Sequence, residues 1–198
     1  MSSSNTQLRA VKRRDYRLGK RAEKQDETRR RIVEAALELH CTVGPARTTV
    51  SQIAERAGVQ RHTYYAHFPE ERQLFLACSG LALERDPLPD VDKFRSLPAG
   101  AKRLRRGLEQ FYGWYERNAG QAACVLRDAE HHELTRETVD LRMAPVFREA
   151  TTLLGEGLSP RARAMLGLAL DFGCWRNLTK QLTSAQAAQL MADAVCAL

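Results

Sequence analysis

The chain of 198 residues is long enough to bury a core as one domain or as two small ones, and it carries 31 basic against 24 acidic residues, a net charge of +7. It has no apolar run long enough to span a bilayer, and its polar N-terminus lacks the apolar segment of a secretory signal. Its five cysteines are scattered and form no C-x-x-C pair, which predicts a reducing, cytoplasmic environment.

Residues 1–25 predict a flexible basic arm. They hold eight basic and two acidic residues, a net charge of +6, and few apolar residues. Residues 26–68 add a net charge of +1 and the remainder is neutral, so the positive surplus lies at the N-terminal end. A polyanionic partner explains this placement, because basic side chains that neutralise phosphates release counterions. A solvated tail that helps solubility explains it equally well.

Residues 26–43 predict the first helix. Ile32, Ala36 and Leu39 recur at helical spacing, so one face of this helix is apolar. Gly44–Pro45 ends it, because proline cannot continue a helix and glycine favours its end.

The following stretch, residues 48–69, predicts two short helices joined by a tight turn. Thr49 can cap the first helix, since its hydroxyl can accept a hydrogen bond from a free amide of the first turn. Gly58 can end that helix in a left-handed conformation. On the second helix Tyr64 and Phe68 can face the core, which leaves a polar stripe outside. This is the helix-turn-helix arrangement, whose second helix enters the DNA major groove, and an ordinary helical hairpin is the alternative.

The pattern over residues 28–76 closely resembles the N-terminal domain of the TetR family of bacterial repressors. The resemblance rests on Ile32, Ala35, Ala36, Leu39, Gly44, Thr48, Thr49, Val50, Ile53, Ala54, Ala57, Gly58, Val59, Thr63, Tyr65, His67, Phe68 and Leu74. It implies an all-α fold with a three-helix DNA-binding domain over residues 26–70 and a helical effector-binding and dimerisation domain over residues 71–198. It also implies a homodimeric repressor that an unidentified small molecule releases from a near-palindromic double-stranded DNA operator.

The resemblance further implies which residues contact DNA. Arg61 can form a bidentate pair with guanine and Gln60 with adenine. Tyr65 matches a position that usually holds a phosphate, whereas Glu71 stands where a phosphate-binding lysine is usual and Arg72 beside it can substitute. The predicted DNA-binding residues are Thr49, Gln60, Arg61, His62, Thr63, Tyr65, His67 and Arg72.

From residue 71 a helix runs to about residue 85, and a loop with three prolines follows over residues 86–99. Residues 100–131 predict two helices with a break at residues 118–120, and residues 134–156 predict another that Pro145 kinks or divides. Aromatic side chains gather here, and the family keeps its effector pocket in this domain. The predicted effector-binding residues are Phe111, Trp114, Tyr115 and Phe147, with plain core packing as the alternative.

Two final helices are predicted, one from residue 159 through residue 178 and one over residues 185–198. Their apolar residues fall on more than one face, so they need a partner. Similar proteins pair these helices with a second copy in a four-helix bundle, and packing within the same domain is the alternative. The predicted dimerisation residues are Leu170, Trp175, Leu190, Met191 and Val195.

Adjacent His131 and His132 are predicted to be exposed rather than metal ligands, because neighbouring helical side chains point about 100° apart. No catalytic or nucleotide-binding motif occurs in the sequence, so we predict neither an enzyme nor a cofactor. Two alternatives remain: a DNA-binding regulator without a small-molecule effector, and a helical interaction module or enzyme whose basic arm meets another partner.

Overall fold

The computed structural model describes residues 3–198, with side chains from residue 19 onward. Within that range the protein consists of helices and connecting segments, without a strand, as the all-α prediction requires. The helices are α1 (Ser3–Thr42), the short η1 (Pro45–Arg47), α2 (Val50–Ala57), α3 (Arg61–His67), α4 (Glu71–Arg85), α5 (Asp92–Arg95), α6 (Ala101–Arg117), α7 (Ala119–Ala129), α8 (Glu133–Arg142), α9 (Ala144–Leu154), α10 (Pro160–Ala169), α11 (Phe172–Leu178) and α12 (Ser184–Cys196). Among the described residues, no helix has the length and hydropathy that crossing a membrane requires.

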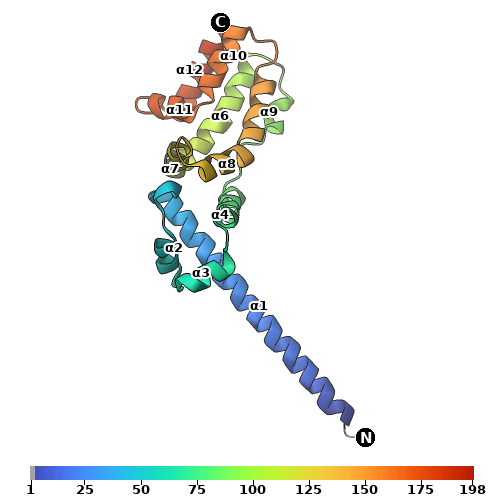
Figure 1. Ribbon diagram of the computed structural model, residues 1–198. Helices are drawn as coiled ribbons and strands as arrows, with labels where there is room; N and C mark the ends of the chain where they lie inside the picture. Colours follow the sequence, from blue (N-terminus) through green and yellow to red (C-terminus); the bar gives the residue numbers. More distant parts are fainter. Residues whose placement is uncertain (1–2) are drawn as a thin grey trace.

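The N-terminal head is formed by the second half of α1 with α2, α3 and α4 (Figure 1). One continuous core holds it together, and the apolar stripe predicted on α1 packs there against the inner faces of the helix-turn-helix. Its members include Ile32, Ala36, Leu39, Ile53, Ala57, Tyr64, Phe68 and Leu74. The three-helix prediction is therefore confirmed.

The N-terminal half of α1 departs from the prediction. A flexible arm was expected up to residue 25 and a helix from residue 26, but α1 extends to Ser3. The physical reason is composition, because residues 3–25 contain no proline and a single glycine, and arginine and lysine are good helix formers. Residues 1–2 lie outside the described range. Figure 1 shows the extension running past α3 and away from the C-terminal domain.

Residues of α5 to α7 and of α9 to α12 form a second core, in which α12 packs along α6 (Figure 1). Together with α8 these helices make up the body of the molecule. α6 supplies Phe111, Tyr112 and Tyr115, which are almost completely buried. Both phenols find acceptors, as buried tyrosines need: Tyr112 donates to the Ala169 carbonyl at 2.8 Å and Tyr115 to the Leu170 carbonyl at 2.6 Å. These bonds hold α6 against the end of α10.

Several boundaries in the body follow local sequence signals. Asn118 ends α6 and begins α7, and Pro145 lies in the first turn of α9, so the predicted break and division are confirmed. The helix predicted from residue 159 through residue 178 is instead two, α10 and α11. Asp171 causes the split, because its carboxylate accepts a hydrogen bond from the Cys174 amide at 2.9 Å and caps a new helix.

Candidate functional site

α2 begins with a reciprocal cap. The Thr49 hydroxyl accepts a hydrogen bond from the Gln52 amide at 3.3 Å, and the Gln52 side-chain oxygen accepts one from the Thr49 amide at 2.8 Å. Gly58 ends the helix with φ 65° and ψ 39°, and the amides of Gly58 and Val59 both return to the Ala54 carbonyl. These local hydrogen bonds thus fix the direction of the chain between the end of α2 and the start of α3.

Two buried aromatic side chains anchor the inner face of α3. Tyr64 and Phe68 are 2% and 1% exposed, with their ring centroids 6.1 Å apart. Tyr65 points the other way and is 46% exposed. The predicted DNA-binding residues on or beside α3 that are exposed are Gln60, Arg61, His62 and Tyr65, and those that are half-buried are Thr63 and His67. The helix therefore presents a polar outer face, together with exposed Thr49 at the start of α2.

Arg29 joins α3 to α1. Its guanidinium donates to the carbonyl of His67 at 2.9 Å and lies 4.1 Å from the centre of the Phe68 ring. A cation over an aromatic face is favourable, and the bonded carbonyl belongs to the last turn of α3. No local sequence pattern predicts this contact, because Arg29 and His67 are 38 positions apart in the chain.

Arg72 does not stand free beside α3. Two of its guanidinium nitrogens donate to a Glu137 carboxylate oxygen, at 2.8 and 2.5 Å, so α4 of the head is joined to α8 of the body. The hydrogen bonds from Arg72 lower the pKa of Glu137 below its ordinary value. In this conformation the predicted phosphate contact is thus engaged within the protein.

A second link joins head and body at Asp128 of α7, which is 1% exposed. Its carboxylate accepts hydrogen bonds from the Ala46 amide at 2.9 Å and from Arg127 at 2.8 Å. Burial by itself would raise the pKa of Asp128, but these hydrogen bonds outweigh it, so the pKa lies below its ordinary value. Gly44 has φ 104°, and a Cβ there would lie 2.4 Å from the carboxylate, so the close approach requires glycine.

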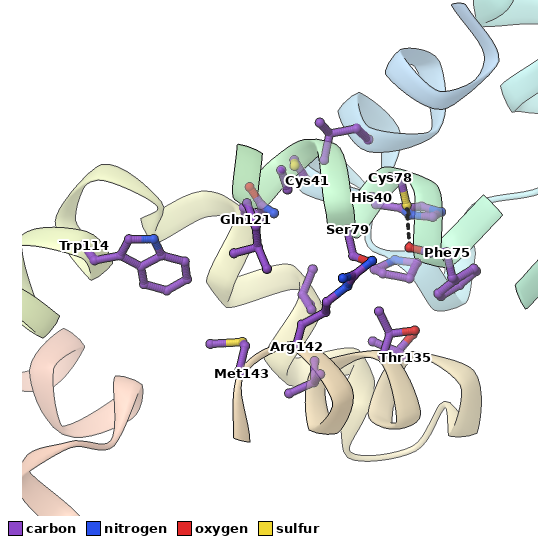
Figure 2. A pocket seen from close by; sticks show the side chains of 17 residues that line it. His40, Cys41, Phe75, Cys78, Ser79, Trp114, Gln121, Thr135, Arg142 and Met143 are labelled. Atoms are coloured by element: carbon purple, nitrogen blue, oxygen red, sulfur yellow. Dashed lines mark hydrogen bonds between the residues drawn. The ribbon is translucent and has the colours of Figure 1, made fainter. Parts of the chain in front are cut away.

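A cavity of about 90 Å³, here called the junction cavity, lies where the head meets the body (Figure 2). Side chains from α1 and α4 form one wall, and those from α6, α7 and α8 form the other. His40 and Cys78 line it with Nδ1 and Sγ 3.5 Å apart. Burial lowers the pKa of His40 to about 4 and raises that of Cys78 to about 12, so both groups are neutral near pH 7.

A larger cavity, here called the upper cavity, has a volume of about 340 Å³ and lies within the body, lined by residues from α6 through α11. Two of the predicted effector-binding residues, Tyr115 and Phe147, line the upper cavity, whereas Trp114 lines the junction cavity. Phe111 lines neither and packs against Phe147, with ring centroids 4.9 Å apart. Core packing is therefore the better account of Phe111.

The predicted dimerisation residues are mostly inside the body. Leu170, Trp175, Met191 and Val195 are buried in its core, and Leu190 is 48% exposed on α12. Packing within the same domain, the alternative, accounts for the burial of these four residues. On the neighbouring α10, Leu168 is 54% exposed.

The two adjacent histidines have separate surroundings. His131 is exposed as predicted, whereas His132 is half-buried, because its ring caps α8 by accepting a hydrogen bond from the Thr135 amide at 3.3 Å. Over the described part of the chain, no three or more histidine, cysteine, aspartate or glutamate side chains gather as metal ligands would.

Comparison with known proteins agrees with this geometry. Residues 32–78 match the family model described as "Bacterial regulatory proteins, tetR family". The HTH-type transcriptional regulator SrpR of Pseudomonas putida is 42% identical over 83 residues, which cover 40% of this chain and 39% of SrpR. The match therefore spans well under half the length of this relative.

Solved structures extend the likeness to the whole fold. A transcriptional regulator from Rhodococcus sp. Rha1 superimposes with a TM-score of 0.60 at 16% identity, covering 84% of this chain and 95% of that protein. The regulator FadR of Bacillus subtilis, solved in complex with stearoyl-CoA, gives a TM-score of 0.57 at 20% identity, and the match covers 84% of this chain and 96% of FadR. At these identities the likeness establishes the arrangement of head and body.

Proposed function

We propose that this chain, whose residues 32–78 match the family model of the tetR family of bacterial regulatory proteins, is a DNA-binding transcriptional regulator that acts in the cytoplasm. The observation that carries the proposal is the geometry of α3. Its inner face is locked by Tyr64 and Phe68, and its outer face presents Arg61 and Tyr65 to solvent. A short, rigidly held helix with exposed polar side chains fits the major groove.

On this proposal the exposed side chains divide into two classes. Gln60 and Arg61, at the start of α3, read base edges, because an amide pairs with adenine and a guanidinium with guanine. Thr49, Tyr65 and His67 hold the backbone phosphates that flank the groove. Basic residues in the N-terminal half of α1 add affinity that does not depend on sequence.

The regulator is proposed to act as a homodimer. A two-fold dimer presents two copies of α3 to a near-palindromic operator, and helices α10 and α12 carry exposed Leu168 and Leu190 at the far end of the molecule from α3 (Figure 1). Pairing of these faces between two copies covers apolar surface that one chain leaves in water.

Control by a small molecule completes the proposal. Repression ends when an effector binds a cavity of the body and favours a spacing of the two heads that no longer matches the operator. The body contains cavities, and FadR, which shares this fold, was solved with stearoyl-CoA. A regulator that binds DNA without such an effector is the alternative.

Titration of a labelled DNA duplex with the full chain at increasing salt tests the proposal. Neutralising six or more phosphates lowers the affinity by about a thousandfold or more between roughly 50 and 200 mM salt. Removal of residues 1–25 should weaken binding without changing the preferred sequence. Affinity that does not change with salt contradicts DNA binding, and DNA binding that no ligand weakens favours the alternative.

A further inference from the structure

We infer that the junction cavity binds a compact apolar carboxylate, with Arg142 as its counter-ion. The regulatory consequence of this inference rests on the proposed function, whereas the binding itself does not. Arg142 is the last residue of α8, and Figure 2 shows its side chain beside Ser79 and facing α4 across the cavity.

The shape of the ligand follows from the apolar part of the lining. Leu37, Phe75 and Ala82 come from the head, and Val125, Val139 and Met143 from the body. With roughly 10–15 Å³ for each water-sized group, about 90 Å³ gives room for roughly six to nine such groups. A single aromatic ring or a short branched chain with one polar substituent fits this space.

The charge of the ligand follows from Arg142. Its guanidinium donates to the Leu76 carbonyl at 3.0 Å and to the Ser79 hydroxyl at 3.3 Å, which are both neutral acceptors. Within the described part of the chain, no ion pair includes Arg142. A half-buried cation without a counter-ion gains when an anion arrives, and guanidinium pairs with carboxylate through two parallel hydrogen bonds.

Two further features of the lining point the same way. None of the 17 described residues that line the cavity is acidic, so a cationic ligand finds no partner there. Among the described hydrogen bonds none involves the Gln121 side chain, which lines the cavity from α7, across from α8 (Figure 2). Its amide can donate to the second oxygen of a carboxylate.

Because the cavity lies between head and body, a ligand bound there contacts both and influences how the head is placed. Both walls must keep their spacing for the ligand to touch them, and one wall belongs to α1 and α4, which carry the helix-turn-helix. A ligand that fits one arrangement of head and body better than another shifts the population toward it.

Benzoate and its neutral analogue benzamide test this inference, with isothermal titration of the full chain as the measurement. We expect saturable binding of benzoate at least about tenfold tighter than that of benzamide. Arg142→Gln should remove the preference for the carboxylate, Arg142→Lys should keep part of it, and Arg148→Gln, an exposed arginine on the next helix, should leave it unchanged. Thermal unfolding of each variant checks that the fold is intact.

A second pair of variants assigns the binding to one cavity. Ala82 lines only the junction cavity of the two described here and Gly167 only the upper cavity. Ala82→Leu should therefore weaken benzoate at least about tenfold while Gly167→Leu does not, since a filled cavity excludes the ring. Loss of binding in Gly167→Leu alone overturns the inference.

Equal binding of benzoate and benzamide also overturns the inference, as does a carboxylate preference that survives Arg142→Gln. So does the failure of both benzoate and the smaller 3-methylbutanoate to bind the folded protein. These titrations contain no DNA, so their failure leaves the proposed DNA binding intact. Conversely, a chain that binds benzoate but fails the salt titration with duplex DNA refutes the regulator and not the ligand site.

Discussion

Arg61 stands in the first turn of α3 with its guanidinium in water, and the described ion pairs and hydrogen bonds do not include it. An arginine free of internal partners keeps its donors for a base edge. Arg61→Ala should cost about 1–3 kcal/mol in operator affinity and relax the sequence preference at one position of each half-site. Binding to variant duplexes measures both effects. Arg161→Ala, an exposed arginine on α10, is the control and should leave affinity and preference unchanged.

His40 gives the protein a dependence of stability on pH. Its pKa is lowered to about 4 from 6.5, so the unfolded chain takes up a proton that the folded chain excludes. The stability that neutral His40 provides is therefore present above pH 6.5 and is lost as the pH falls toward 4. We expect the free energy of unfolding to drop by about 2 kcal/mol between about pH 6.5 and 5, as urea denaturation can measure.

The control for that prediction is His40→Leu, which removes the buried titrating group and should flatten the pH dependence. His131→Gln replaces an exposed histidine and should keep the dependence of the parent protein. An equal drop in the parent and in His40→Leu refutes the role of His40.

At the scale of elements, the ion pair of Arg72 and Glu137 joins α4 to α8, so on the proposed function it withdraws a cation from the side of the head that faces DNA. Both side chains are about half exposed, so the pair adds little stability. Glu137→Gln should free Arg72 for a phosphate, which raises duplex affinity several-fold and steepens the logarithmic salt slope by about 1. Glu133→Gln, an exposed position on the same helix, should change neither quantity in the salt titration. An unchanged slope in Glu137→Gln would rule out a phosphate role for Arg72.

Elements defined by local signals could be predicted from the sequence. Thr49 and Gly58 mark the ends of α2 by their own chemistry, and the spacing of Tyr64 and Phe68 sets the buried face of α3. Contacts between distant segments could not be predicted. The hydrogen bond between the Ala46 amide and Asp128 joins residues that are 82 positions apart, and no local sequence pattern predicts it.

Helical periodicity also cannot distinguish a face that meets its own domain from a face that meets a second copy. Trp175 and Val195 were expected at a dimer interface for that reason, yet they lie in the core of the body. The same ambiguity affected the aromatic residues of α6. Phe111 and Tyr115 share a helical face, but only Tyr115 reaches a cavity.

At the scale of the whole molecule, the proposed dimer forms through the outer faces of α10 and α12. Leu168→Glu combined with Leu190→Glu puts a charge on each exposed leucine and should convert a dimer into a monomer. Leu141→Glu is the matched control, since Leu141 is 52% exposed on α8 and should leave the dimer intact. Light scattering coupled to gel filtration gives the mass. A double variant that stays dimeric places the interface elsewhere.

The central claim is that two copies of α3 read a specific DNA sequence, and selection of random duplexes by the purified protein tests it most directly. We predict enrichment of an inverted repeat by the parent chain and its loss in Tyr65→Ala, because Tyr65 is exposed on the outer face of α3 and holds a phosphate on this account. A folded parent chain that enriches no motif, or a Tyr65→Ala variant that enriches the same motif equally well, would contradict it.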